Sequence, residues 1–460
     1  MLVATATTVF SRVTVLAPQT RIDVALPSDV AVADLLPMLL NLAGQVTPDG
    51  GARHGGWCLG KLGEPPLDLS RTLASLGVVD GDLVQLRRRN ENPPPPLYDD
   101  VVDAIADAEP GGLRPWTSDT ARRLGNIACG LALLTAAVAV HLAGARFPLA
   151  AAITAGVAAL VAIASGSTVT RVHRAPDSGV VIAAAGALPL AFVCGLHAVP
   201  GRLGPASLVL AFAAMGVISV ISLLVLGGGI TVFVAGAGVG ATGAVASLVA
   251  VFLPNSLAGI AAGAAAVALA GLSVLPRLTI QLAKLPLPHV PGSAAELKED
   301  DEFPDYAVIE RRAGLAHQYM TGMLIACGLV AAAGAVIAAG GSSWFAPMFG
   351  GVVAAVLLLR ARTYANGGQA IALLATGLLT ATGLMVAWLL RASPLHQILW
   401  VFGLLVVLAA TAIMLGVVVP KQRFSPVLRR SVDVTEAVLI AAVLPLALAV
   451  MDLYSVVRHL

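Results

Sequence analysis

Charged side chains are scarce in this chain. They make up 12% of the 460 residues, whereas hydrophobic residues make up 58% and the mean hydropathy is +0.88. This composition excludes an ordinary soluble globular protein. Long apolar stretches follow one another after residue 120, and none has an ionised side chain at its centre. Ion-coupled pumps use intramembrane acids and bases to move their ions, so this absence argues against a pump.

Residue patterns that carry chemistry are also missing. The four cysteines form no CxxC pair, and three of them lie inside apolar stretches, where cysteine behaves as a small hydrophobic residue; they are Cys58, Cys129, Cys194 and Cys327. The chain has no Walker P-loop, no HExxH, no GxSxG and no Cys/His set spaced for a metal. Basic residues form no long stripe for nucleic acid. We therefore expect no catalytic, cofactor-binding or metal-binding residue, no nucleic-acid partner and no enzyme activity.

The first 90 residues have the pattern of a small α+β domain. Alternating apolar and polar residues predict a β-hairpin, and a helix and further short strands follow it. Ser28 or Asp29 is the expected helix cap, and Pro37 is expected to kink this helix or to shift its start. The predicted order is strand, strand, helix, strand, helical turn and strand, over residues 12–16, 21–26, 32–40, 57–59, 70–77 and 83–87. This order, and the segment Thr72–Arg89 in particular, resembles a ubiquitin-like β-grasp domain.

Ubiquitin-type conjugation is not expected of this head. The last strand continues into Arg-Arg-Arg-Asn-Glu-Asn at 87–92 without a terminal Gly-Gly, and Lys61 is the single lysine of the first 119 residues. A fixed docking module fits these features better.

A linker is expected between the head and the apolar region. Four consecutive prolines at 93–96 predict a stiff spacer, and residues 98–109 predict an acidic amphipathic helix that binds a partner or packs on the head. The predicted domains are therefore a head over 1–90, a Pro-rich and acidic linker over 91–120, and a membrane domain over 121–460. Residues 1–119 carry nine Lys/Arg against fifteen Asp/Glu, and their start lacks the pattern of a signal peptide.

The membrane domain is expected to be all-α, with about eleven transmembrane helices. Each apolar stretch is long enough to cross the hydrocarbon as a helix. Two features stay open: whether Gly227–Gly229 forms a tight turn or a re-entrant break, and whether Gly236-x-x-x-Gly240 and Gly259-x-x-x-Gly263 mark close helix contacts. The predicted spans are 125–144, 147–165, 179–198, 204–226, 229–252, 256–275, 318–340, 343–360, 367–390, 395–418 and 434–454.

Basic residues in the loops predict the orientation. Fifteen fall on one side, namely Arg122, Arg123, Arg171, Arg174, Arg277, Lys284, Lys298, Arg311, Arg312, Arg360, Arg362, Lys421, Arg423, Arg429 and Arg430. The other side receives only four, Arg146, Arg202, Arg391 and Arg458. The positive-inside rule then places the head in the cytoplasm and the C-terminus outside. The loop 276–317 is cytoplasmic in this scheme, and its acidic run 296–302 is either a solvated loop or a docking site for a basic partner.

The whole arrangement resembles the EccD family, the polytopic membrane component of the type VII (ESX) secretion system of mycobacteria. The resemblance rests on the architecture and on four segments, Gly77–Arg87, Asp99–Ala108, Leu357–Tyr364 and Ser425–Leu448. It implies a structural subunit of the inner membrane that forms a dimer around a lipid-lined cavity. It further implies EccB, EccE and the ATPase EccC as partners, with the head beside EccC, and membrane lipids around the spans.

A second hypothesis is a secondary transporter of an apolar or zwitterionic solute. A broken helix at Gly227–Gly229 favours this hypothesis, because broken helices often surround transport sites. The absence of a coupling group at mid-depth argues against it.

Overall fold

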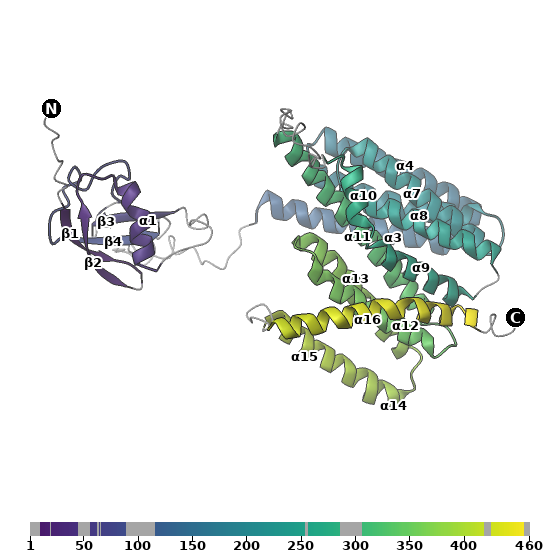
Figure 1. Ribbon diagram of the computed structural model, residues 1–460. Coiled ribbons are helices and arrows are strands. Elements are labelled where there is room, and N and C mark those ends of the chain that lie inside the picture. The colour runs from purple at the N-terminus through teal and green to yellow at the C-terminus, as the bar shows by residue number, and fades with distance from the viewer. Residues whose placement is uncertain are drawn as a thin grey trace, which may run out of the picture. The chain divides into compact units, whose positions relative to one another are not determined.

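A computed structural model describes most of the chain, and residues outside the described ranges receive no structural account. The described residues are 10–18, 20–44, 56–61, 64, 66–88, 116–253, 256–285, 306–417 and 425–454. The chain divides into two compact units, Met1–Pro115 and Trp116–Leu460 (Figure 1). The predicted spacer at 93–96, the predicted acidic helix at 98–109 and the acidic run at 296–302 lie outside the described residues. The domain boundaries at 90 and 120 stay predictions.

The head is built on one mixed sheet. Its strands are β1 (Phe10–Leu16), β2 (Arg21–Pro27), β3 (Trp57–Lys61) and β4 (Leu83–Arg88), in the spatial order β2-β1-β4-β3. The hairpin pair β1–β2 and the pair β3–β4 are antiparallel, whereas the pair β1–β4 is parallel. Helix α1 (Val32–Leu42) buries Val32, Leu35 and Leu39 in the same core as the inward side chains of the strands. The predicted β-grasp fold is confirmed.

The start of α1 differs from the expectation. Neither Ser28 nor Asp29 caps the helix, which begins after Ala31 without a side-chain cap. The first amides instead donate to main-chain carbonyls, Val32 N to Arg71 O at 3.0 Å and Ala33 N to Leu69 O at 2.9 Å. The cap prediction was wrong because a distant loop satisfies the amides that local side chains usually satisfy. Pro37 lies inside α1 and does not shift its start.

The Asp-Gly turn before β4 ties three parts of the head together. Gly81 has a φ of 88°, which favours glycine, and its amide donates to Arg12 O at 2.7 Å. Lys61 Nζ lies 2.8 Å from Asp82 Oδ2 and donates to Gly77 O at 2.9 Å. The hydrogen bond from Lys61, together with the amide of Val79, lowers the pKa of the Asp82 carboxyl. The single lysine of the head is therefore a structural residue that closes this turn.

The second unit is entirely helical where it is described. Among the described residues of this unit, ten helices or helix runs are long and apolar enough to span a membrane. They are α3 (Ser118–Gly144), α4 (Pro148–Arg171), α5 (Pro176–Ile182) with η2 (Ala183–Ala187) and α6 (Leu188–Ala198), α7 (Pro205–Leu226), α8 (Ile230–Phe252), α11 (Tyr306–Ala338), α12 (Phe345–Arg360) with η4 (Ala361–Thr363), α13 (Gly367–Leu389), α14 (Pro394–His396) with η5 (Gln397–Phe402) and α15 (Gly403–Val417), and α16 (Pro426–Val450).

The eleventh predicted span is a bent pair of helices. Helix α9 (Leu257–Gly271) and helix α10 (Leu275–Leu282) meet at an angle of 62°. The fifteen residues of α9 cover roughly 22 Å, which is less than the hydrocarbon thickness. Both helices pack along α11. Gly271 lies against Cys327, and Arg312 Nη1 donates to Lys284 O, just after α10, at 2.8 Å. The pair therefore accompanies one crossing of α11, which agrees with about eleven spans.

Glycine turns and a proline account for two local features of the bundle. Gly227 and Gly229 have φ angles of 67° and 69° and join α7 directly to α8, so the open question at Gly227–Gly229 resolves as a tight turn. The π-helical turn η2 lies just before Pro189, whose missing amide interrupts the regular ladder. The helical path continues through η2 despite this interruption, so α5, η2 and α6 form one span.

Small residues let α7 and α8 touch through their backbones. A side chain at Gly240 would bring its Cβ to 2.6 Å from Gly216 Cα and 2.8 Å from Phe212 O. Gly236 faces Ser219 in the same crossing, and Ser219 Oγ donates to Phe233 O at 2.6 Å. The Gly236-x-x-x-Gly240 segment thus marks a close helix contact. Gly259 and Gly263 face Met451, the residue that follows α16, with somewhat more room.

Candidate functional site

A cluster of four charged residues joins α12 to α16. Glu436 of α16 is buried, with 5% of its surface exposed. Its Oε1 lies 3.4 Å from Arg360 Nη1 and its Oε2 lies 3.1 Å from Arg362 Nη2. Arg362 also pairs with Asp433, one helical turn before Glu436. A buried carboxylate is tolerated only when it is paired in this way, so the cluster fixes how α12 ends against α16.

Local helix geometry explains why these four residues meet. Asp433 and Glu436 are three residues apart and therefore share a face of α16. Arg360 is the last residue of α12, and Arg362 lies in the 3₁₀ turn η4 that follows. The change of helix type at this point lets both guanidinium groups face one carboxylate. Since α12 ends here, the cluster lies at one end of the bundle and not at its centre.

The sequence interpretation missed this cluster. It counted Arg360 and Arg362 only as loop residues that set orientation, and it placed Glu436 at the end of a span over 434–454. Helix α16 instead begins at Pro426, so Glu436 lies a further two turns inside the helix. A signal was present, because two acids three residues apart interrupt the basic start of an otherwise apolar helix.

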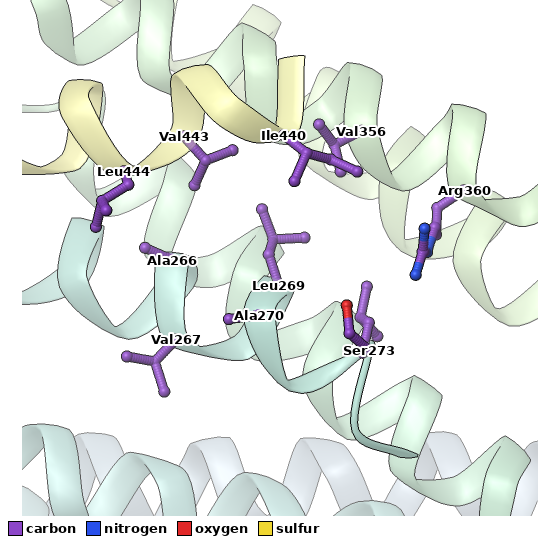
Figure 2. Close-up of a pocket in the computed structure, with 11 residues that line it drawn as sticks. Ala266, Val267, Leu269, Ala270, Ser273, Val356, Arg360, Ile440, Val443 and Leu444 are labelled. Carbon is purple, nitrogen blue, oxygen red and sulfur yellow. The ribbon is translucent and has the colours of Figure 1, made fainter. Parts of the chain in front are cut away.

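An apolar groove runs along α9 and α16 next to this cluster. It consists of two cavities of about 280 Å³ and 540 Å³ that share Ala266, Val267 and Leu444 in their linings. Figure 2 shows the first cavity, with Arg360 and Ser273 at one end and the side chains of Leu269, Ile440 and Val443 turned into it. The second cavity continues between α8, α9 and α16 as far as Met451. Sequence reasoning did not anticipate this groove.

Two histidines, one in the last turn of α3 and one in the last turn of α6, are in contact with each other. His141 Nδ1 of α3 is 3.1 Å from His197 Nε2 of α6, and His197 is buried. Gly144 lies directly against the His197 ring, where a Cβ atom would collide with it. The hydrogen bond between the two rings satisfies a ring nitrogen of the buried His197.

Metal-binding and disulfide chemistry find no support within the described part of the chain. No group of three His, Cys, Asp or Glu residues there is placed to hold a metal ion. All four cysteines are free.

Comparison with known proteins gives the family. The EccD-like transmembrane domain model matches residues 121–460, and the YukD protein of the WXG100 protein secretion system matches residues 10–86. The chain belongs to the EccD family. Its relatives include the ESX-4 secretion system protein eccD4 of Mycobacterium tuberculosis, 31% identical over 98% of this chain and 97% of the relative. The ESX-3 secretion system protein EccD3 of Mycolicibacterium smegmatis is 27% identical over 95% of this chain and 94% of that protein.

Two solved structures are similar to this chain. A protomer of the ESX-3 core complex superposes with a TM-score of 0.62 at 25% identity, covering 97% of this chain and all of that one. A chain of an ESX-5 inner membrane complex shares the fold, with a TM-score of 0.54 and 21% identity over 89% of this chain. With its apolar helices and EccD-like domain, this EccD-family chain is a multi-pass membrane protein, and both solved relatives belong to multi-subunit complexes.

Proposed function

We propose that this chain is the EccD subunit of a type VII (ESX) secretion complex in the bacterial inner membrane. The observation that supports it most is the joint match of head and membrane domain to a protomer of the ESX-3 core complex over 97% of the chain. The role is structural, with no reaction step of its own. The four charged residues that join α12 to α16 fit this role, since each is used to hold helices together.

In this proposal the head is a docking module in the cytoplasm. It binds the ATPase EccC, while the membrane domain pairs with a second copy of itself and contacts EccB and EccE. The lack of conjugation chemistry supports docking, because the one lysine of the head closes its Asp-Gly turn. Orientation with the N-terminus in the cytoplasm and the C-terminus in the periplasm follows from the basic residues. Arg311 and Arg312 at the start of α11 and Arg429 and Arg430 at the start of α16 support it.

Purification in mild detergent tests this function. A tagged full-length chain, extracted from its own membranes, is expected to elute with an ATPase in one large particle. Mass spectrometry of the peak identifies the co-eluting subunits. Elution as a monodisperse monomer that binds a small apolar or zwitterionic solute would refute the proposal and favour a secondary transporter.

A further inference from the structure

We propose that the groove between α9 and α16 binds an anionic phospholipid, with one acyl chain along the groove and the phosphate at Arg360. The site lies within a single chain, along its own helices α9 and α16, with α12 lining the first cavity and α8 and α11 lining the second. The proposal does not depend on the role in secretion. It rests on the shape and lining of the groove, on the hydrogen-bonding capacity of Arg360 and on the charge around that end.

The groove has the size and character of an acyl-chain site. Apart from Arg360, Ser273 and Thr242, its lining is apolar, and alanines of α9 such as Ala266 and Ala270 leave room along its floor. From Ile260 to Ser273 it runs roughly 20 Å along α9, somewhat more than the hydrocarbon of one leaflet. The groove is open to its surroundings, since Val267 is 70% exposed and Leu444 is 62% exposed. A chain from the surrounding bilayer can therefore enter from the side.

Arg360 is suited to hold a phosphate at one end of the groove. Among the described residues Arg360 makes one ion pair, the long contact from Nη1 to Glu436 at 3.4 Å, and its side chain also lies beside the Tyr364 hydroxyl, whereas Arg362 makes the shorter contacts to Glu436 and Asp433. A guanidinium has several N–H donors in a planar fork that matches phosphate oxygens. The Arg360 side chain is 27% exposed and lines the cavity opposite the Ser273 hydroxyl (Figure 2). Donors therefore remain for an anion that enters here.

The surroundings of Arg360 are those of the head-group region of a bilayer. Helix α10 exposes Leu278, Ile280 and Leu282 beside the exposed Arg277, a composition typical of helices that lie in the membrane interface. Arg429 shares the face of α16 that carries Glu436, because the two are seven residues apart. The charges of Arg360, Arg362, Asp433 and Glu436 cancel, so Arg277 and Arg429 leave this end positive. An anionic head group is favoured over a zwitterionic one.

Photolabelling tests the proposal on the full chain. The protein is placed in phosphatidylcholine nanodiscs with a trace of phosphatidylglycerol that carries a diazirine near the end of one acyl chain. A phosphatidylcholine probe with the same chain serves as the reference. Labels mapped by mass spectrometry are expected on α9 and α16 within the groove, with roughly tenfold more label from phosphatidylglycerol.

Three variants separate the acyl and phosphate contributions. Arg360→Gln is expected to bring the two probes to nearly equal labelling, while Glu436 keeps Arg362 as its partner. Ala270→Phe fills the groove from an exposed position and should lower labelling by both probes severalfold. Ala441→Phe, at an exposed position of α16 outside the groove lining, is the matched control and should change nothing. Labelling that is unchanged in Ala270→Phe, or that shows no preference between the probes in the unaltered chain, overturns the proposal. A helix of a partner protein would then be the better occupant of the groove.

Discussion

Gly240→Leu is expected to destabilise the membrane domain strongly. A Cβ atom at this position would lie 2.6 Å from Gly216 Cα, 2.7 Å from Gly216 N and 2.8 Å from Phe212 O. These are backbone atoms, so no side-chain rotation relieves the collision and α7 must separate from α8. Overpacking usually destabilises by about 1–3 kcal/mol, and a backbone collision belongs at or above the top of that range. Size-exclusion chromatography and thermal unfolding in detergent measure the effect.

Gly351→Leu is the matched control for this substitution. Gly351 also lies within a spanning helix, α12, but a Cβ atom there meets nothing within 4 Å. Replacing glycine by leucine at an open helical position removes backbone freedom from the unfolded chain and introduces no collision. The control should therefore elute as a single peak with an unfolding temperature at or above that of the unaltered chain. Equal behaviour of the two variants would contradict the assigned contact between α7 and α8.

The double substitution Arg360→Gln and Arg362→Gln is expected to destabilise the domain strongly. It removes both cations from Glu436, whose side chain is only 7% exposed. Removing the partners of a buried charge typically costs about 3–5 kcal/mol, because the desolvated charge remains. Either single substitution leaves one arginine on the carboxylate and should cost clearly less. Thermal unfolding of the purified full chain in detergent compares the variants.

Adding Glu436→Gln to the double variant provides the control. With the buried charge removed as well, the triple variant should recover most of the lost stability, because the buried position then holds a neutral amide and the remaining carboxylate, Asp433, is 60% exposed. A triple variant as unstable as the double variant would mean that the arginines act through packing and not through Glu436.

Local patterns predicted the elements whose causes are local. The strands of the head, its Asp-Gly turn and the apolar spans all follow from alternation, turn residues and apolar length. The Gly236-x-x-x-Gly240 spacing left a close contact open, and its partner Gly216 was not identified. These features need no knowledge of distant residues.

Features that depend on distant residues were missed. Glu436 meets Arg360 and Arg362 across more than seventy residues, so no window of sequence contains the cluster. The prediction of a cap for α1 was wrong for the same reason, since the carbonyls of Leu69 and Arg71 accept hydrogen bonds from its first amides. The groove beside α9 arises from five helices that are distant in sequence, α8, α9, α11, α12 and α16, and small residues such as Ala266 predict close packing as readily as an opening.

Deletion of the head is the most direct test of the proposed structural role. A tagged chain lacking residues 1–110 and the full-length chain are purified in parallel from membranes that contain the other subunits. The truncated chain should insert normally, because every described spanning helix begins after residue 115. The molar ratio of co-purified ATPase to tagged chain is expected to be substantial for the full-length protein and near zero for the truncation. An unchanged ratio would contradict it.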